Sequence, residues 1–306
     1  MTRISGVLSP VVTPFNADFS VDAERFVRHC QWLMSNGVGL AVFGTNSEAN
    51  SLTVGERLDL LDRVVDSGVD AARMMPGTGC CALDDSVRLT AHAVKRGCGG
   101  VLMLPPFYYK GVSDEGLFRN FAQIIERVGD DRLRIYLYHI PPVSQIPISL
   151  GLIERLLDRY PKQIAGVKDS SGDWNNTKAM LDRFAQRGFD VFAGSETFLL
   201  ANLRNGGKGC ISATANVNPA AIHDLFQRWK GDGADALQAG LDGIRATFQK
   251  FPMIPALKAA VAHWGADEGW ARVRPPLVEL DANQRATLVA ELGKRGFAMP
   301  GLAVAA

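Results

Sequence analysis

The sequence predicts an α/β protein, a (β/α)8 TIM barrel with a C-terminal helical appendage. Short apolar segments alternate with longer amphipathic segments from the start of the chain to about residue 230. Eight such pairs follow one another, which is the number that closes a barrel. Beyond residue 230 the strand signals stop and only helical patterns remain.

The strand-like segments are short and almost continuously apolar, as expected for parallel strands buried on both faces. An open, doubly wound sheet would show the same alternation. We favour the barrel because eight units are present and no glycine-rich dinucleotide motif follows the first strand. The predicted strands are residues 6–14, 40–44, 73–77, 100–104, 134–139, 164–169, 190–194 and 209–213.

The helical segments between the strands carry apolar residues at helical spacing and begin after residues that cap helices well. The predicted N-caps are Ser20, Thr53, Ser113 and Ser149. The clearest early helices are residues 21–35, 53–69 and 114–128, and the C-terminal ones are residues 232–250, 254–264 and 281–295. We therefore expect a barrel with the active site in residues 1–230 and a helical region packed on it in residues 231–306.

Composition excludes several classes of function. The chain has 306 residues, 47% of them hydrophobic, and a net charge of +1, so neither nucleic acid nor an anionic membrane is an expected partner. No apolar stretch is long enough to span a bilayer, and no signal-peptide pattern opens the chain. Five cysteines without zinc-ligand spacing predict reduced thiols in a cytoplasmic protein, and five scattered histidines predict no metal site.

Lys168 is the first candidate catalytic residue, because an apolar strand-like run ends on it and a polar turn follows. Barrel active sites lie at the carboxyl ends of the strands. Burial there disfavours the charged ammonium, and a neutral amine attacks ketones to form a Schiff base. Taken alone, this segment favours a lysine that leaves the core and extends to water.

Other strand ends supply partners for such chemistry. Tyr136 and Tyr138 share one face of the fifth strand, with Tyr138 nearer its carboxyl end. The second strand ends in Gly44-Thr45-Asn46-Ser47-Glu48, a turn whose N–H groups and hydroxyls suit a carboxylate, although alone it is compatible with an ordinary polar loop. Together, the lysine, the tyrosine and the turn predict Schiff-base chemistry on a 2-keto acid, without a cofactor or metal.

These residues resemble a known family, the dihydrodipicolinate synthase / N-acetylneuraminate lyase family of class I, pyruvate-handling aldolases. The resemblance runs from Gly6 to about Leu277. It is carried by four motifs in the right order, namely Gly44-Thr45-Asn46-Ser47-Glu48, Tyr138-His139-Ile140-Pro141, Gly166-Val167-Lys168, and Gly206-Gly207-Lys208-Gly209 with Ile211-Ser212.

The resemblance implies a role for individual residues. Lys168 would form the covalent imine with pyruvate, and Tyr138 would act as the general acid and base. Thr45 would relay protons to Tyr138, with Tyr108 completing the relay from a neighbouring subunit of a homotetramer built as a dimer of dimers. Thr45 and Asn46 would bind the carboxylate, and Ile211 would line the imine pocket.

The departures from the family pattern bear on the substrate. Asn46 and Ser47 replace a hydroxyl residue and a glycine, so we expect Ser47 to take a positive φ, and His139 replaces an asparagine. The arginine that holds the second carboxylate in authentic dihydrodipicolinate synthases would fall at Val143. Replacing this guanidinium by an uncharged side chain removes bidentate binding of the second carboxylate.

The polar residues that remain suit a hydroxylated partner. Ser195, Glu196 and His139 are the predicted contacts, although Glu196 is equally compatible with an acid that complements a helix N-terminus. We therefore expect a lyase that cleaves or forms a 2-keto-(3-deoxy)-4-hydroxy acid from pyruvate and an aldehyde. The alternatives are a keto-deoxy sugar acid dehydratase that uses the same imine, 4-hydroxy-tetrahydrodipicolinate synthase, and a catalytically inactive protein that binds a keto acid.

Overall fold

The computed structural model describes residues 3–302, which divide into two compact units of strands and helices. The first unit comprises the segment up to Gly6 together with Asp70–Ile211. The second comprises Val7–Val69 together with the segment from Ser212 on. Each unit is described by itself below.

A parallel sheet forms the centre of the first unit. Its strands are paired in the order of the chain, and every residue in them is buried, which explains their nearly continuous apolar sequence. The strands are β3 (Val101–Met103), β4 (Ile135–His139), β5 (Ile164–Asp169), β6 (Asp190–Ala193) and β7 (Gly209–Ile211).

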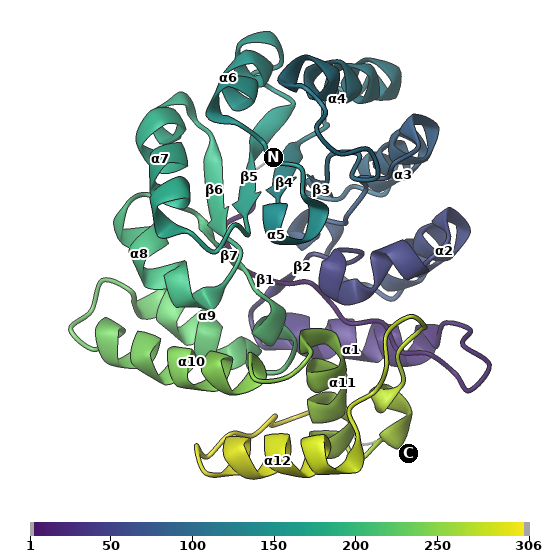
Figure 1. The fold of residues 1–306 in the computed structure, drawn as a ribbon, viewed down its shortest axis with the longest axis vertical. Helices are drawn as coiled ribbons and strands as arrows, with labels where there is room; N and C mark the ends of the chain where they lie inside the picture. Colours follow the sequence, from purple (N-terminus) through teal and green to yellow (C-terminus); the bar gives the residue numbers. More distant parts are fainter. Residues whose placement is uncertain (1–2, 303–306) are drawn as a thin grey trace. The chain divides into compact units, whose positions relative to one another are not determined.

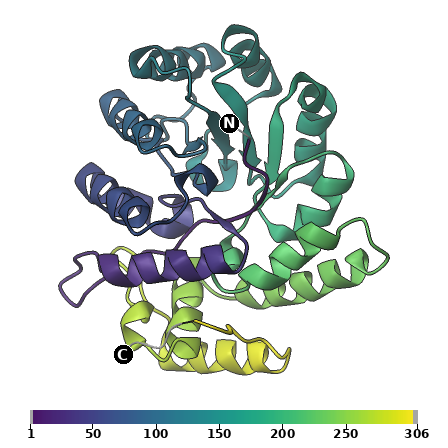
Figure 2. The ribbon, with the colours of Figure 1, turned by 180° about the vertical axis from the view of Figure 1, so that it is seen from behind.

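Helices cover the outside of this sheet, as both views of the ribbon show (Figures 1 and 2). Ser113 and Ser149 cap two of them through their hydroxyl oxygens, as predicted. The helices of the first unit are α3 (Leu83–Lys95), α4 (Asp114–Val128), α5 (Pro141–Ser144), α6 (Leu150–Arg159), α7 (Trp174–Phe184) and α8 (Leu199–Arg204), with the 3-10 turns η3 (Ala71–Arg73), η4 (Ala185–Arg187) and η5 (Glu196–Phe198).

The third predicted strand, residues 73–77, is not a regular strand. It pairs with β3 only locally, because Gly77 forms an isolated parallel bridge with Leu102. The N–H of Leu102 donates to the carbonyl of Pro76 (2.9 Å), and the N–H of Thr78 donates to the carbonyl of Leu102 (3.0 Å). Pro76 has no N–H to donate, which interrupts a regular ladder. The described residues therefore hold seven named strands where eight are predicted.

The part of the second unit that the structure describes contains a short parallel pair and six helices. Strand β1 (Gly6–Ser9), which starts at the unit boundary, pairs with β2 (Gly39–Leu40). The helices are α1 (Ala23–Ser35), α2 (Val54–Asp66), α9 (Pro219–Arg228), α10 (Ala234–Phe248), α11 (Met253–Trp264) and α12 (Ala282–Gly293), with the turns η1 (Thr45–Ser47), η2 (Ala49–Ser51), η6 (Ala213–Asn216) and η7 (Glu268–Ala271).

Two helix starts in this unit test the predicted caps. Thr53 caps α2 in a reciprocal capping box with Glu56, as predicted. The prediction for α1 is wrong, because Asp22 caps it by accepting a hydrogen bond from the N–H of Arg25 (2.9 Å). Ser20 is instead held in the preceding turn, where its hydroxyl donates to Asp18 (2.6 Å).

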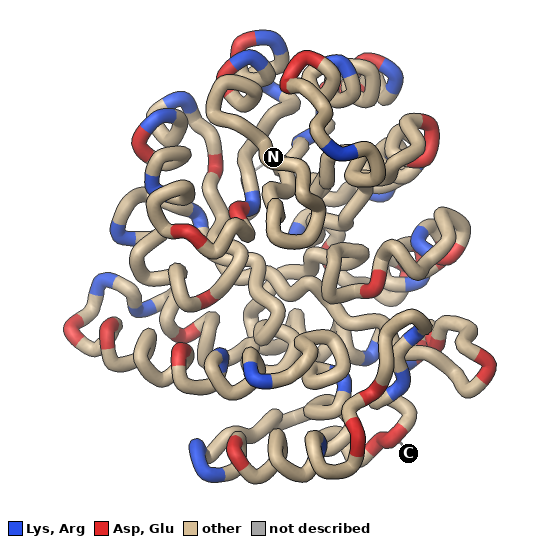
Figure 3. Tube along the Cα trace, in the orientation of Figure 1, with Lys and Arg blue, Asp and Glu red and all other residues tan. Residues whose placement is uncertain are grey.

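The C-terminal helices are present as predicted. Helices α10, α11 and α12 pack on one another, and α11 also packs on η1 and η6. The division of the chain near residue 230 stays a prediction. Positions of Lys and Arg and positions of Asp and Glu are interspersed along the Cα trace (Figure 3). Among the described residues, no helix is both long and apolar enough to cross a membrane.

A buried histidine predicts acid sensitivity of the fold. His29 in α1 is 2% exposed and stacks against Trp32 and Trp270, with ring centroids 5.5 and 5.0 Å away. Burial lowers the pKa of His29 to about 3. The unfolded chain binds this proton at a pKa of about 6.5, so the free energy of unfolding should fall as the pH drops below that value.

We expect His29→Phe to remove this contribution, about 2 kcal/mol between roughly pH 7 and pH 5. The measurement is urea unfolding of both proteins at the two pH values. Equal losses of stability in the wild type and the variant would contradict the assignment.

Candidate active site

Lys168 and Tyr138 are brought together at the carboxyl ends of two neighbouring strands. They are directly paired in the register between β4 and β5. The Lys168 Nζ lies 4.1 Å from the centroid of the Tyr138 ring. Lys168 is 2% exposed and Tyr138 3% exposed, so the amine sits inside the protein and does not extend to water. An amine beside a phenol in a buried site has the composition that imine chemistry requires.

Ile211 lies on the same face of the sheet as Lys168. The register pairs Lys168 with Phe192 on β6 and Phe192 with Gly209 on β7. Side chains alternate along a strand, so Ile211, two residues after Gly209, points to this face as well. The first unit alone therefore presents three of the predicted site residues on one face.

Glycine makes room for an aromatic ring below the lysine. A Cβ on Gly166 would lie 2.2 Å from the carbonyl oxygen of Asp190 and 2.9 Å from the Tyr136 ring. The Tyr136 hydroxyl donates to the Asp190 carboxylate (3.2 Å), and burial followed by the Asp190 charge raises the pKa of Tyr136. The Tyr136 hydroxyl is thus occupied by its hydrogen bond to Asp190, and Tyr138 is the tyrosine beside the amine.

His139 lies on the opposite face, so the sheet does not bring it to Lys168. Its Nδ1 accepts a hydrogen bond from the N–H of Ile148 (3.0 Å). Burial lowers the pKa of His139, against the opposing effect of the Asp169 carboxylate. His139 therefore holds the chain after α5 through this hydrogen bond, and its contact with substrate stays a prediction.

Asp169 fixes the strand end that carries Lys168. Its carboxylate accepts hydrogen bonds from the N–H of Ser171 (2.9 Å), the amide of Asn176 (3.0 Å) and the hydroxyl of Thr177 (2.6 Å). The last two donors belong to α7, so this carboxylate joins β5 to the helix that follows it. The sequence analysis did not single out Asp169, although it directly follows the lysine.

Ser195 and Glu196 follow β6 and open the turn η5. The Ser195 hydroxyl lies 2.6 Å from that of Thr197 and accepts from the Thr197 N–H (3.3 Å), so it caps the turn. Glu196 is 1% exposed at the first position of η5. That place matches the alternative interpretation of Glu196 as an acid at a helix start, and substrate contacts for both residues stay predictions.

Tyr108 lies on the surface of the first unit. It is 74% exposed and meets the Tyr109 ring edge-on, with centroids 5.4 Å apart. A tyrosine that serves a neighbouring subunit must be exposed in its own chain, so this position is compatible with the predicted relay without testing it.

The turn that carries Thr45 and Asn46 belongs to the second unit, where it forms η1. The Ser47 hydroxyl accepts from the N–H of Gly44 (3.2 Å), and the Thr13 hydroxyl donates to the Ser47 carbonyl (2.7 Å). The expected positive φ at Ser47 is wrong. Ser47 ends the 3-10 turn, and the left-handed conformation falls on its neighbour Glu48, with φ +56°.

Glu48 forms a buried ion pair that the sequence analysis missed. The Lys258 Nζ, on α11, lies 2.7 Å from Glu48 Oε1, and both side chains are fully buried. Burial lowers the pKa of Lys258 to about 8, and the Glu48 charge opposes this shift. The signal in the sequence is a single lysine in an apolar run of this helix, because buried charges require partners.

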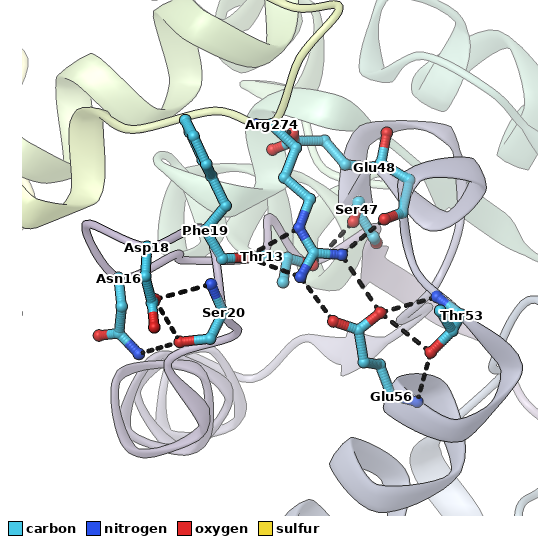
Figure 4. A network of polar contacts seen from close by, with 11 residues as sticks. Thr13, Asn16, Asp18, Phe19, Ser20, Ser47, Glu48, Thr53, Glu56 and Arg274 are labelled. Atoms are coloured by element: carbon cyan, nitrogen blue, oxygen red, sulfur yellow. Dashed lines mark hydrogen bonds and ion pairs between the residues drawn. The ribbon is translucent and has the colours of Figure 1, made fainter.

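A network of polar contacts around Arg274 surrounds the same turn (Figure 4). The N–H of Arg274 donates to Glu48 Oε2 (3.0 Å), and its guanidinium binds the carbonyl of Ser51 (2.6 Å) and the carboxylate of Glu56 (2.5 Å). The hydrogen bond from Arg274 lowers the pKa of Glu56. No group of three or more His, Cys, Asp or Glu side chains in residues 3–302 is placed to hold a metal ion.

Comparison with protein families assigns nearly the whole chain. Residues 3–295 match the model of the Dihydrodipicolinate synthetase family. The chain belongs to this family. It is 32% identical to an uncharacterized DapA-like lyase of Chloroflexus aurantiacus, over 94% of this chain and 96% of that protein. It is also 32% identical to the 4-hydroxy-tetrahydrodipicolinate synthase of Desulforamulus reducens, over 92% and 94% of the two chains.

Solved structures confirm the predicted barrel class. Dihydrodipicolinate synthase from Agrobacterium tumefaciens superposes with a TM-score of 0.87 at 30% identity, over 95% of this chain and 99% of that one. YagE of E. coli K12, a prophage protein of the same family in complex with pyruvate, gives a TM-score of 0.89 at 27% identity, over 97% and 100%. The chain is therefore an enzyme of the lyase class, as predicted.

The Asp169 contacts lead to a prediction about the lysine strand. We expect Thr177→Val, which leaves one acceptor site of a buried carboxylate without its donor, to cost about 1–3 kcal/mol of stability. Thr287→Val is a matched control, because the Thr287 hydroxyl bonds only its own helix at an exposed position. Chemical denaturation measures both, and equal effects would contradict the role given to Asp169.

Proposed function

We propose that this protein is a class I aldolase that cleaves, or forms, a 2-keto-(3-deoxy)-4-hydroxy acid, with pyruvate as the keto-acid component. The observation that carries the proposal is the pairing of Lys168 and Tyr138, both buried, with the amine 4.1 Å from the ring centroid. Family membership supports the same chemistry.

The first stage forms the imine. The Lys168 amine adds to the C2 carbonyl, and the carbonyl oxygen takes up one proton from the amine and one from the general acid and leaves as water. The positive charge of the resulting iminium attracts electrons from the neighbouring carbons. Tyr138 is the group beside the amine and supplies and recovers the protons of this stage.

The second stage breaks the carbon–carbon bond. Tyr138 accepts the proton of the 4-hydroxyl group, the bond between C3 and C4 breaks, and its electron pair moves into the iminium to give an enamine. The aldehyde leaves, C3 takes up a proton, and water hydrolyses the imine to release pyruvate and restore Lys168. The proposal also includes two roles that rest on the sequence motifs alone. Thr45 and Asn46 donate hydrogen bonds to the carboxylate, and Tyr108 acts within a tetramer.

The segment after β4 supports the proposed substrate class. Val143 is 61% exposed on α5, and this helix carries no cationic side chain of its own. The Lys110 ammonium reaches the helix from the preceding loop but donates to the Ser144 carbonyl (2.8 Å) and to the carbonyl of Phe107. A bidentate guanidinium for a second carboxylate is thus missing, which favours an aldehyde that carries hydroxyls.

The imine is tested by mass spectrometry. Incubation with pyruvate and borohydride should add one reduced pyruvate to the wild type and nothing to Lys168→Ala, because the proposal assigns the imine to the Lys168 amine. Lys162→Ala, which removes an exposed lysine from the same unit, is the control that should still be labelled. An unlabelled wild type would defeat the proposal.

Tyr138→Phe tests the proton transfers. We expect kcat for release of pyruvate from such keto acids to fall by about 10²–10⁴, because a positioned acid and base contributes that factor. Tyr109→Phe, at an exposed position, should leave kcat unchanged. A Tyr138→Phe enzyme with normal kcat would assign the proton transfers to another group.

Product analysis of the same keto acids separates the remaining alternatives. An aldolase yields pyruvate and an aldehyde, whereas a dehydratase yields one product lighter by a water molecule. Turnover of pyruvate with aspartate semialdehyde at ordinary enzyme efficiency would instead favour 4-hydroxy-tetrahydrodipicolinate synthase, the name borne by the Desulforamulus reducens relative.

A further inference from the structure

Lys258 is a charged residue in the middle of an apolar helix. The other buried residues of α11 are proline, alanine, leucine and valine, and Lys258 itself is 0% exposed among them. Its ammonium lies 2.7 Å from Glu48 Oε1 and 4.5 Å from the centroid of the Phe15 ring. Retaining a charge here costs desolvation, so the lysine requires an explanation beyond packing.

Glu48 connects Lys258 to the turn that carries Thr45 and Asn46. Glu48 is the residue that closes η1, and its N–H bonds the carbonyl of Thr45 (3.1 Å). One carboxylate oxygen of Glu48 binds Lys258, and the other accepts the N–H of Arg274 (3.0 Å). Both oxygens are therefore held by the C-terminal part of the chain.

The backbone conformation of Glu48 requires contacts that stabilise it. Its φ of +56° lies in the left-handed region, which a residue with a side chain adopts only when the surroundings impose it. If Glu48 relaxed to an ordinary φ, the N–H of Ala49, which closes the turn by donating to the Gly44 carbonyl (3.4 Å), would turn away. The ion pair thus acts on the geometry of the turn and not only on packing.

We propose that Lys258 is a positioning residue for the keto-acid carboxylate. Through its ion pair with Glu48 it keeps the turn in the conformation in which Thr45 and Asn46 present their donors to that group. This inference rests on the proposed function, in which the turn binds the carboxylate.

A purely structural role makes a different prediction. Replacing both members of a buried ion pair by side chains of similar size is often neutral for stability, whereas removing one member leaves the other charge unpaired. A double variant, Lys258→Met with Glu48→Gln, is therefore expected to fold. If the pair only stabilises the fold, this variant should bind substrate normally.

The experiment compares two ketones of nearly the same size. Pyruvate carries the carboxylate, and pyruvamide replaces it by a neutral amide. The concentration dependence of borohydride trapping gives the apparent affinity for each ketone, and thermal unfolding reports stability. Lys250→Met is the matched control, because Lys250 makes an ion pair of the same length (2.7 Å) with Glu291 at an exposed site.

In the folded double variant we expect the apparent affinity for pyruvate to fall by about tenfold or more, as for loss of a hydrogen bond to a charged group. Trapping of pyruvamide should change by less than about twofold, because the charged-group contribution is absent from it. Lys250→Met should match the wild type with both ketones. Glu48→Gln alone leaves the Lys258 charge without its counter-ion but keeps a side chain of the same shape and an acceptor oxygen for Lys258, so a smaller loss confined to pyruvate is expected.

Unchanged affinity for pyruvate in the double variant would overturn the inference and leave the aldolase proposal intact. Equal losses for pyruvate and pyruvamide would overturn it too, because they indicate general damage to the site. If the double variant does not fold, Glu48→Gln decides in the same way. A wild-type protein that traps no pyruvate would instead defeat the proposed function itself.

Discussion

The register between β4 and β5 is the constraint on which the proposed chemistry depends. It places Tyr138 directly opposite Lys168, and a shift by one residue would turn one of the two side chains to the other face of the sheet. Gly166, the Asp190–Tyr136 contact and the Asp169 hydrogen bonds all act on this pair of strands or on the residue next to the lysine. Conserving the register therefore matters more to the site than any one surface contact.

The two groups of predicted site residues are held by different kinds of interaction. In the first unit, Lys168, Tyr138 and Ile211 are placed mainly by backbone pairing within a sheet. In the second unit, the turn with Thr45 and Asn46 is irregular and is held by side chains, namely Ser47, Thr13, Glu48 and their partners. Substitutions near the turn are thus expected to alter ligand binding more readily than those in the strands.

Periodicity in the sequence predicted the helices, the parallel strands and the strand-end position of Lys168, because burial on both faces leaves a clear apolar pattern. It failed at residues 73–77, where Pro76 interrupts the ladder, and at Ser20, where a nearby aspartate competes as the cap. The Glu48–Lys258 pair was not predictable by spacing, since its partners lie 210 residues apart. That Lys168 shares the face of Tyr138, and not that of His139, followed only from the observed register.

The separation of Glu48 and Lys258 by 210 residues has a consequence for the order of folding during synthesis. The β4–β5 pair and its lysine can form once the middle of the chain has left the ribosome, whereas the turn acquires its buried counter-ion only after α11 has emerged. A nascent chain lacking the last fifty residues would carry the nucleophile without the partner of Glu48. Keto-acid recognition would therefore be acquired later than the strand pair that carries the nucleophile.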